Sequence, residues 1–457
     1  MARPDRKTYQ NKYNDLVDTL RDEIARGMYR PGSYLPGENH LIERFQLSKH
    51  SVRLALDELV KEGRIERIPR VGTRVAARPS ERTELFFGVY PSMPEETDLT
   101  RLLEIFHDIH PHITVNTLDL PYGNAESIMK LLQLGVVDIV TLNTPDFIYF
   151  CENGSLQLLE RQERRGENYP FLNEFFGTDN GEVYAQPFVY SPIVICYNKN
   201  HLRQKGLFEP DSGWTWNDLR QLLRELKEPN RFSIFFNADH LNRWSIFLLQ
   251  QGMRFVRDSD GRIAPSEPNA FELLRFVRDM IHENGLFPGA VFGEKDVESL
   301  FLQQKVSVIM TTYFRLNALK RAEFDFDIAQ LPRGNRNDTL LLSSGTAVNA
   351  NTSKKEAAQS LADFLSSDNA QTLIRKHTFS IPANKIIHDA HLPVCPATPS
   401  RILLHREMIS NYTTYDKLGL TIKECYVFGN CLKQYFSNIV DEVGLMKLFN
   451  DHIQTKK

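Results

Sequence analysis

LPGENHLIERFQLSKHSVRLALDELVKEGRIERIPRVGTRV occupies residues 35–75 and contains two short helical patterns followed by two strand patterns. The first pattern predicts a short helix from about Glu38, and Gln46-Leu47 supplies a turn after it. Ser48 is a suitable N-cap for a second helix over residues 49–61. Val52, Leu56 and Leu59 recur at helical spacing in that second helix, so one of its faces is expected to be buried.

The flanking residues complete a small domain. Residues 9–27 show helical periodicity, and Gly27 with Pro31-Gly32 ends the pattern. Two short strands are expected at about 64–68 and 73–77, around a turn at 69–72. Three helices followed by a hairpin predict a winged helix-turn-helix, a fold that places its recognition helix in the DNA major groove.

The same run resembles the DNA-binding domain of the GntR regulators over about 70 residues. The spacing from Leu35-Pro36 to Gly72-Thr73 carries the resemblance. The family typically has Arg where Asn39 stands, Arg at Lys49 and Gly at Arg70. These departures change the expected operator sequence but leave the DNA-binding prediction in place.

Geometry selects the candidate DNA contacts, because the first residues of a recognition helix face base edges. Arg53 can pair with guanine or bind a phosphate, and the sequence leaves both roles open. The alternative is that these cations form a solvated helix face. The predicted contacts from the helices and the wing are Glu38, Asn39, Ser48, Lys49, His50, Ser51, Arg53, Arg70, Gly72, Thr73 and Arg74.

Length and charge separate this domain from the rest of the chain. The 457 residues exceed one typical domain. Residues 1–80 hold 16 Lys/Arg against 11 Asp/Glu, a balance of +5, while the remainder holds 39 against 47, a balance of −8. A basic small domain on an acidic large one indicates that only the first meets double-stranded DNA. No cofactor is predicted for such a regulator.

No stretch approaches the roughly 20 apolar residues of a membrane span, and the N-terminus lacks the apolar core of a secretory signal. The five cysteines form no CxxC pair, as expected for reduced thiols. We therefore expect a cytoplasmic protein with no membrane partner.

Strand and helix patterns alternate after a polar linker at 79–83. Strands are expected at 85–90, 113–118 and 138–142, and helices at 99–109 and 125–134. This alternation predicts an α/β sheet with crossover helices. Ligands of such sheets lie at the carboxyl ends of the strands, where Tyr90 and Asn143 stand.

Three further segments resemble extracellular solute-binding proteins of the sugar-binding type. They are AQPFVYSPIVICYNKNHL with GWTWNDLRQLL, FNADHLNRWSIFLLQQG with FLQQKVSVIMTTYFRL, and SSGTAVNANTSKKEAAQSLADFLSSDNAQTLIRK. The resemblance implies a periplasmic-binding-protein-like α/β fold over 84–457, with ligand held between two lobes. Lobe 1 is expected at about 84–190 and 314–365, and lobe 2 at about 191–313 and 366–457, following the winged helix-turn-helix domain at 1–78.

Sugar sites combine aromatic faces with convergent amides and hydroxyls. The resemblance places Trp244 and Tyr313 where the family often has stacking residues, although most aromatic residues of any chain belong to its core. The predicted ligand-binding residues are Tyr90, Asn143, Tyr190, Ser191, Asn237, Asp239, Trp244, Tyr313 and Ser344.

Together these patterns predict a ligand-responsive transcription regulator, a repressor that senses a sugar or oligosaccharide and works as a homodimer on paired half-sites. The alternative is a GntR-type chain with a pyridoxal-phosphate aminotransferase-like domain, for which Lys354 or Lys355 in Ser353-Lys354-Lys355 is the nearest candidate lysine. The sequence contains no Walker loop, HExxH, GxSxG or clustered His/Cys metal set, so we expect neither an enzyme nor a metal site.

Overall fold

The computed structural model describes residues 6–25, 28–29, 32–69, 71–76, 83–178, 180–288, 296–389 and 397–454. The chain divides into two compact units. The first comprises Met1–Glu84 with His110–Thr114, and the second Leu85–Ile109 with Val115–Lys457. Most of the predicted linker, together with Cys395, lies outside the described residues.

The first unit has the predicted winged helix-turn-helix architecture. Its elements are α1 (Arg6–Ala25), α2 (Glu38–Phe45), α3 (Lys49–Lys61), β1 (Ile65–Ile68) and β2 (Gly72–Val75). The buried face of α3 is the predicted one, since Val52, Leu56 and Leu59 join the core formed with α1 and α2. The two strands pair antiparallel from Ile65↔Val75 to Ile68↔Gly72, which forms the wing.

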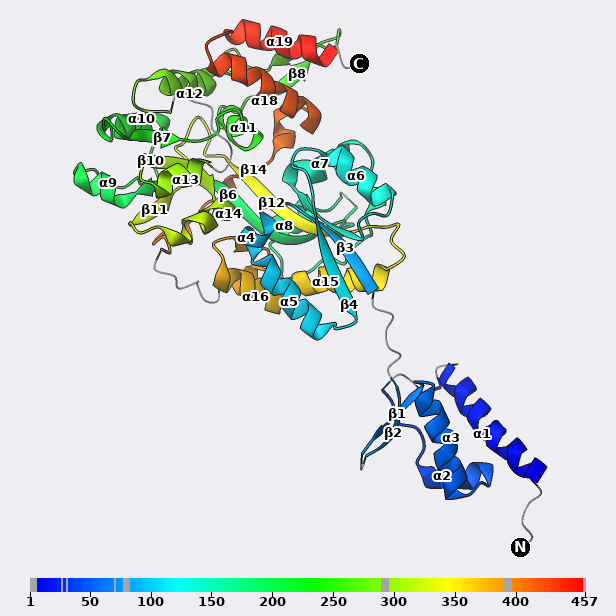
Figure 1. Ribbon diagram of the computed structural model, residues 1–457. Helices are drawn as coiled ribbons and strands as arrows, with labels where there is room; N and C mark the ends of the chain where they lie inside the picture. The colour runs from blue at the N-terminus through cyan, green and yellow to red at the C-terminus, as the bar shows by residue number, and fades with distance from the viewer. Residues whose placement is uncertain are drawn as a thin grey trace. The chain divides into compact units, whose positions relative to one another are not determined.

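The second unit is a two-lobed α/β structure (Figure 1). Strands of its described part form one curled sheet in the order β4-β3-β5-β12-β6-β10-β7, while β11 and β13 also pair with β6 and β14 pairs with β12. The α/β fold predicted from the alternating patterns is confirmed.

Lobe 1 is built around β3 (Thr83–Val89), β4 (Ile113–Asp119) and β5 (Ile139–Asn143). Apolar residues of these strands, such as Phe87 and Leu142, are fully buried. The helices of lobe 1 are α4 (Met93–Thr97), α5 (Leu99–Ile109), α6 (Ala125–Gln133), α7 (Thr144–Glu152), α8 (Pro170–Phe175) and α15 (Lys355–Leu365).

Lobe 2 surrounds β7 (Phe232–Phe235), β10 (Val306–Thr312) and β11 (Phe326–Ala329). Its helices are α9 (Lys199–Gln204), α10 (Trp216–Glu225), α11 (Leu241–Leu249), α12 (Glu272–His282), α13 (Asp296–Leu302) and α14 (Tyr313–Leu316), with the small hairpin β8 (Phe255–Arg257) and β9 (Ile263–Pro265). The C-terminal helices α18 (Ile422–Phe436) and α19 (Glu442–Gln454) bury Phe428 and Phe449 in this lobe's core.

Two strands, β6 (Gln186–Asn198) and β12 (Thr339–Val348), run from one lobe into the other. Strand β6 pairs with β12 up to Pro192 and with β10 from Ile193 onward. Every residue of β6 is buried, as expected for a strand covered on both faces. Because the crossing is a paired strand and not a loop, it constrains how the lobes can move.

Two of the predicted lobe boundaries differ from the pairing. The segment after 313 stays with lobe 2, because β11 pairs with the second half of β6. The segment after 365 stays with lobe 1, because β13 (Ile381–Pro382) pairs with Tyr190 and Val189, and Gln371 of α16 (Asp368–His377) donates to the Phe188 carbonyl. Short helix α17 (Lys385–Asp389) follows, and β14 (Tyr412–Thr413) pairs with β12. Among the described helices, none has the length and apolarity of a membrane span.

Candidate DNA-binding face and ligand cleft

The first turn of α3 presents the predicted cations to solvent. Ser48 is the N-cap, and its Oγ accepts from the Ser51 backbone N–H at 3.2 Å. Lys49, His50 and Arg53 are exposed, whereas Ser51 is only 2% exposed. Ser51 therefore stabilises the start of the helix and is not placed to contact a base, because the cap folds its side chain against Ser48.

An ion-pair network links α3 to its neighbours. The Arg53 Nε–H donates to both carboxylate oxygens of Glu38, at 3.1 and 3.0 Å. Arg67 of β1 donates to the Arg53 carbonyl at 3.0 Å and pairs with Asp57 at 3.0 Å. Asn39 is exposed one position after Glu38. The recognition helix, α2 and the wing therefore meet at Arg53.

The wing carries its own ion pair. Arg74 donates to Glu66 at 2.6 Å across the hairpin, and Thr73 is partly buried beside it. Gly72 has a φ of 151° and its ideal Cβ would lie 3.4 Å from the Tyr34 ring, so a side chain there would be strained. Arg70, a predicted wing contact, lies outside the described residues.

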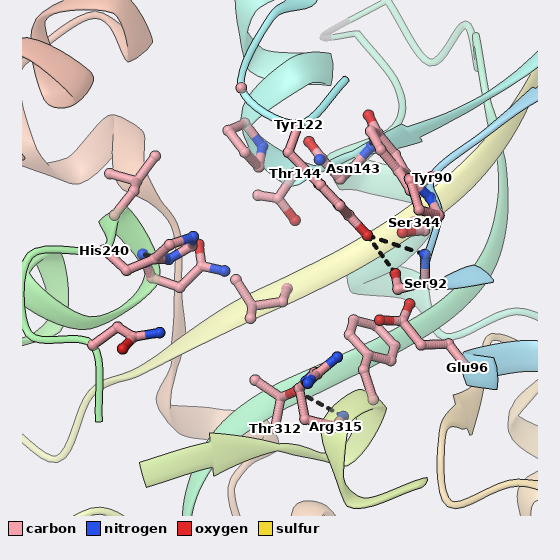
Figure 2. A pocket seen from close by; sticks show the side chains of 18 of the residues that line it. Tyr90, Ser92, Glu96, Tyr122, Asn143, Thr144, His240, Thr312, Arg315 and Ser344 are labelled. Carbon is pink, nitrogen blue, oxygen red and sulfur yellow. Dashed lines mark hydrogen bonds between the residues drawn. The ribbon is translucent and has the colours of Figure 1, made fainter. Parts of the chain in front are cut away.

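A cleft of about 260 Å³ lies between the two lobes of the second unit (Figure 2). Lobe 1 contributes residues from the carboxyl ends of β3, β4 and β5, as the general rule for α/β sheets predicts. Lobe 2 contributes the start of α11, the start of α13 and the β10–α14 junction. The lining includes Tyr90, Ser92, Glu95, Glu96, Tyr122, Asn143, Thr144, Asn237, His240, Asn242, Arg243, Glu298, Thr312, Phe314, Arg315, Ser343, Ser344 and Tyr426.

The lobe 1 wall is an aromatic pair held in place by hydrogen bonds. Tyr122 stacks on Tyr90 with ring centroids 5.0 Å apart and an interplanar angle of 11°. The Tyr122 hydroxyl donates to Ser92 Oγ at 2.5 Å and accepts from the Ser92 N–H at 3.3 Å. Because Tyr122 is 50% exposed, its ring offers a fixed aromatic surface to the cleft.

Beneath that pair lies a buried carboxyl. The Tyr90 hydroxyl donates to Asp146 and accepts from the Asn143 N–H at 3.3 Å. The Asn143 side chain caps α7 by accepting from the Asp146 N–H at 2.9 Å. Burial raises the pKa of Asp146 to about 6, against which the hydrogen bond from Tyr90 acts. Tyr90 thus serves as the fixed base on which Tyr122 rests.

Charged groups face the cleft from both lobes. Glu298 is 3% exposed and accepts from Arg315 at 2.9 Å and from Thr311 Oγ1 at 3.0 Å. Glu96 is 8% exposed, and burial raises its pKa to about 7, opposed by a hydrogen bond with Ser92 and by the charge of Arg315. Because Arg315 is already bonded to Glu298, its charge offsets only part of the effect of burial, and the pKa of Glu96 stays raised.

Polar groups with no other partner also line the cleft. The side chains of Asn237 and Ser344 make no hydrogen bond to the part of the chain that the structure describes, and Ser344 is 4% exposed. His240 caps α11 by accepting from the Asn242 N–H at 3.2 Å, which aims the start of that helix at the cleft. Asn237 is partly buried and Ser344 is buried, and both line the cleft, so their side chains are available to bind a ligand.

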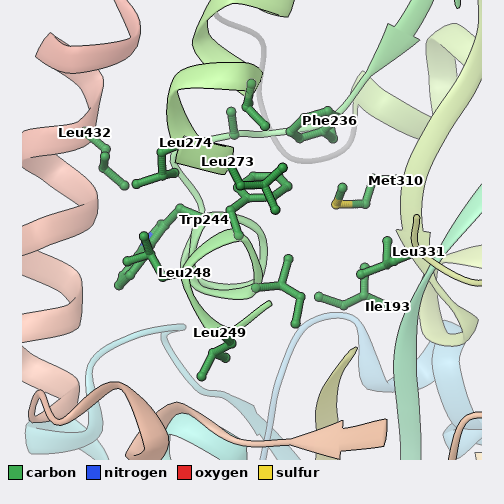
Figure 3. Close-up of a cluster of buried hydrophobic side chains, with 14 of the residues drawn as sticks. Ile193, Phe236, Trp244, Leu248, Leu249, Leu273, Leu274, Met310, Leu331 and Leu432 are labelled. Atoms are coloured by element: carbon green, nitrogen blue, oxygen red, sulfur yellow. The ribbon is translucent and has the colours of Figure 1, made fainter. Parts of the chain in front are cut away.

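The predicted ligand residues divide into two groups. Tyr90, Asn143, Asn237 and Ser344 line the cleft. Trp244, by contrast, is fully buried in the lobe 2 core beside Leu248 and faces Leu432 of α18 (Figure 3). Its ring lies 5.0 Å from that of Phe428, and Gly429 leaves the room that the indole needs. The structure therefore replaces the predicted stacking role of Trp244 with a packing role, because the ring lies on the inward face of α11.

The other predicted residues that lie away from the cleft are fixed in the hinge region or on the surface. Tyr313 is fully buried, its backbone N–H donates to Ser191 Oγ at 2.8 Å, and its hydroxyl accepts from the His405 N–H at 3.1 Å. Tyr190 is packed among Tyr169, Phe171 and Tyr412. Asp239 faces Lys433 at 3.8 Å. The side chain of Ser191 holds the chain crossing and does not line the cleft.

Several lining residues were absent from the predicted set, above all Tyr122, Glu96, Glu298, His240 and Arg315. Tyr122 follows the strand expected at 113–118, so the carboxyl-end rule that selected Tyr90 and Asn143 also applied to it. The carboxylates and Arg315 carry no such signal, because charged residues are usually on the surface.

The comparisons assign both parts of the chain. Residues 102–392 match the family described as "Bacterial extracellular solute-binding protein", which is well over half of the chain. The chain belongs to that solute-binding protein family. Residues 12–75 match "Bacterial regulatory proteins, gntR family", so this member also carries a GntR DNA-binding domain. The regulator and sensor architecture predicted from the sequence is thereby confirmed.

Individual relatives agree with this division. "Probable transcriptional regulator PhnF" of Escherichia coli is 39% identical over 180 residues, covering 37% of this chain and 70% of that protein. The "Arabinose metabolism transcriptional repressor" of Halalkalibacterium halodurans is 33% identical over 76 residues, covering 17% of this chain and 20% of that protein. The ABC substrate-binding protein of Listeria monocytogenes in complex with cycloalternan has a TM-score of 0.69 at 18% identity, over 82% of this chain and 99% of that one.

The pyridoxal-phosphate alternative has no support. The matched families are a regulator and a solute-binding family. Lys354 is engaged with Asp138 at 3.1 Å and Lys355 with Glu160 at 2.7 Å, and neither lysine lines the cleft. Within the residues that the structure describes, no group of three or more His, Cys, Asp or Glu side chains is placed to hold a metal ion.

Proposed function

We propose that this regulator is a cytoplasmic repressor that senses a sugar or oligosaccharide in the interlobe cleft. The observation that carries the proposal is the Tyr122 ring, which is stacked on Tyr90 and half exposed in a cleft that Asn237 and Ser344 also line. Sugar rings offer an apolar face for such stacking and hydroxyls for the surrounding amides and carboxylates. The cycloalternan complex and the name of the arabinose repressor support this ligand class and this sign of regulation.

Ligand binding would act by holding the lobes together. At the rim, Lys423 of α18 reaches Glu126 of α6 at 2.9 Å, and the Ile422 N–H donates to Glu152 of α7 at 3.1 Å. A ligand that touches both walls favours this closed arrangement by its difference in affinity for the closed and open states. The contacts that the start of α18 makes with lobe 1 would therefore form when the lobes close and break when they open.

The DNA-binding domain would work as one half of a homodimer. One recognition helix reads only a few base pairs, and two related half-sites supply the remaining specificity. If closure changes the geometry of the dimer, one state fits the half-site spacing better. A coupling free energy of 1–3 kcal/mol corresponds to roughly 5–150-fold changes in operator affinity, and DNA changes ligand affinity by the same factor.

The first test is a thermal-shift screen of mono- and oligosaccharides on the full chain. A ligand present at about 100 times its dissociation constant adds about 2.7 kcal/mol of stability to the state that binds it. Tyr122→Ala is the matched variant, because it removes the stacking surface and leaves Tyr90 beneath it. A screen in which no sugar stabilises the wild type, while another class of solute does, would contradict the ligand assignment.

The second test is calorimetry of the ligand so found, with and without DNA duplexes that the protein selects. Different affinities in the two titrations are expected. Equal affinities would mean that the cleft and the DNA-binding domain are not coupled, and the repressor mechanism would then be wrong. Analytical ultracentrifugation of the free and DNA-bound protein tests the homodimer; a monomer protecting a single half-site would contradict it.

A further inference from the structure

We infer that Glu38 is a positioning residue that holds the Arg53 guanidinium in the orientation for reading a guanine. This inference rests on the proposed DNA-binding function and goes beyond it, because it assigns a base and a mechanism. Both Glu38 oxygens accept from the Nε–H of Arg53, at 3.1 and 3.0 Å. The two residues come from different helices, α2 and α3, so the contact also fixes the arrangement of the helix-turn-helix.

The geometry leaves the other end of the guanidinium available. Nη1 and Nη2 of Arg53 make no hydrogen bond to the part of the chain that the structure describes, and the side chain is 51% exposed. These two nitrogens are a parallel donor pair that matches the O6 and N7 acceptors of guanine in the major groove. Occupation of Nε by Glu38 favours this end-on pairing over any arrangement that uses Nε.

The backbone of Arg53 is fixed as well. Arg67 of β1 donates to the Arg53 carbonyl at 3.0 Å while it pairs with Asp57 of the same helix at 3.0 Å. Both the side chain and the main chain of Arg53 are therefore held before DNA arrives. Because Arg53 is already ordered, DNA binding does not have to offset the entropy that its side chain would otherwise lose.

Glu38 also has an electrostatic effect that separates its role from a purely structural one. Its negative charge lies beside Arg53 and repels phosphates, so it weakens binding to DNA of any sequence. As a positioning residue, Glu38 thus raises sequence specificity while it lowers the affinity for non-specific DNA. Loss of a purely structural contact would instead lower both the specificity and the non-specific affinity.

The test uses the full chain and duplexes recovered from a library with a randomised core. Wild type is expected to enrich a guanine at a fixed position of each half-site. Replacing that base by 7-deazaguanine removes the N7 acceptor and should lower wild-type affinity by up to the roughly 5- to 150-fold discrimination of a bidentate contact. Arg53→Ala should lose this sensitivity, because it removes every guanidinium donor from the base.

Glu38→Gln is the decisive variant, and Glu43→Gln on the exposed face of α2 is its matched control. Both remove one negative charge and should bind a scrambled duplex more tightly than wild type. Only Glu38→Gln should discriminate less between guanine and 7-deazaguanine, and it should add nothing when combined with Arg53→Ala. Thermal unfolding of the two glutamine variants checks that both remain folded.

The outcomes separate the inference from the function on which it rests. If wild type enriches no sequence, sequence-specific DNA recognition fails and the inference fails with it. If wild type discriminates and Glu38→Gln discriminates as well as Glu43→Gln, DNA binding stands and the positioning role is overturned. A loss of scrambled-duplex affinity in Glu38→Gln would likewise overturn it in favour of a structural contact.

Discussion

On the recognition helix, Lys49, His50 and Arg53 lie within a stretch of five residues and face solvent, whereas the cleft gathers Tyr122, Glu96 and Arg315 from three distant segments. Polar groups of the first kind are surrounded by water and are screened by salt. In the second group Glu96 is buried and Arg315 is partly buried, so their energies depend on packing and protonation, while Tyr122 is half exposed. We therefore expect changes of buried groups at or behind the cleft to alter stability and pH dependence, and changes on the helix to alter affinity and salt dependence.

The largest effect is expected for Trp244→Ala, which lies behind the cleft. Removing a fully buried indole from the lobe 2 core leaves a cavity and should lower the free energy of unfolding by about 3–5 kcal/mol. Chemical denaturation followed by circular dichroism measures this. Trp244→Phe should cost less. Sugar affinity of the folded fraction should stay within a few-fold of wild type, and a large loss of affinity at unchanged stability would restore the stacking role.

This case shows where sequence reasoning reaches its limit. The winged helix was predictable because its core lies within residues 16–75 and its buried side chains follow helical spacing, as Val52, Leu56 and Leu59 demonstrate. Trp244 and Tyr313 were placed by family position alone. Which face of a helix points into a cleft depends on the partner elements, here α18 for Trp244 and His405 for Tyr313.

The second prediction concerns the pH dependence of Glu96. Burial raises its pKa from 4.5 to about 7, so the folded state retains a proton that the unfolded state releases. Folding is then disfavoured progressively as pH rises from about 4.5 to about 7, by roughly 3 kcal/mol at full effect. Glu96→Gln removes this dependence.

Denaturation of wild type and Glu96→Gln at pH 5 and pH 8 checks the sign. The variant should gain stability relative to wild type at the higher pH. Asp146, whose pKa burial also raises, is present in both proteins and cancels in the comparison. A stability difference that does not change with pH would mean that Glu96 is solvated or paired in solution.

A smaller effect is expected for Tyr122→Ala. Its ring is half exposed and stacked on Tyr90, so its loss should leave stability nearly unchanged while weakening sugar binding by about 1–2 kcal/mol, roughly 5- to 30-fold. Isothermal titration calorimetry measures this. Tyr122→Phe keeps the ring and loses only the bond to Ser92, so it should retain most of the affinity. Equal losses in the two variants would assign the effect to the hydroxyl.

The smallest effect is expected for Lys49→Ala on the recognition helix. Lys49 is exposed on the first turn of α3, so its removal should leave folding unchanged and weaken DNA binding by on the order of 1 kcal/mol. If Lys49 binds a phosphate, the loss is similar for selected and scrambled duplexes, and the slope of log affinity against log salt falls by about one. If it reads a base, the loss is confined to selected duplexes. Lys61→Ala, exposed in the last turn of the same helix, removes the same charge far from the predicted groove contact and should have little effect. Equal effects of the two variants would mean that α3 attracts DNA by its overall charge. Lys49 would then make no specific contact with DNA, and its position on the first turn of the helix would not matter.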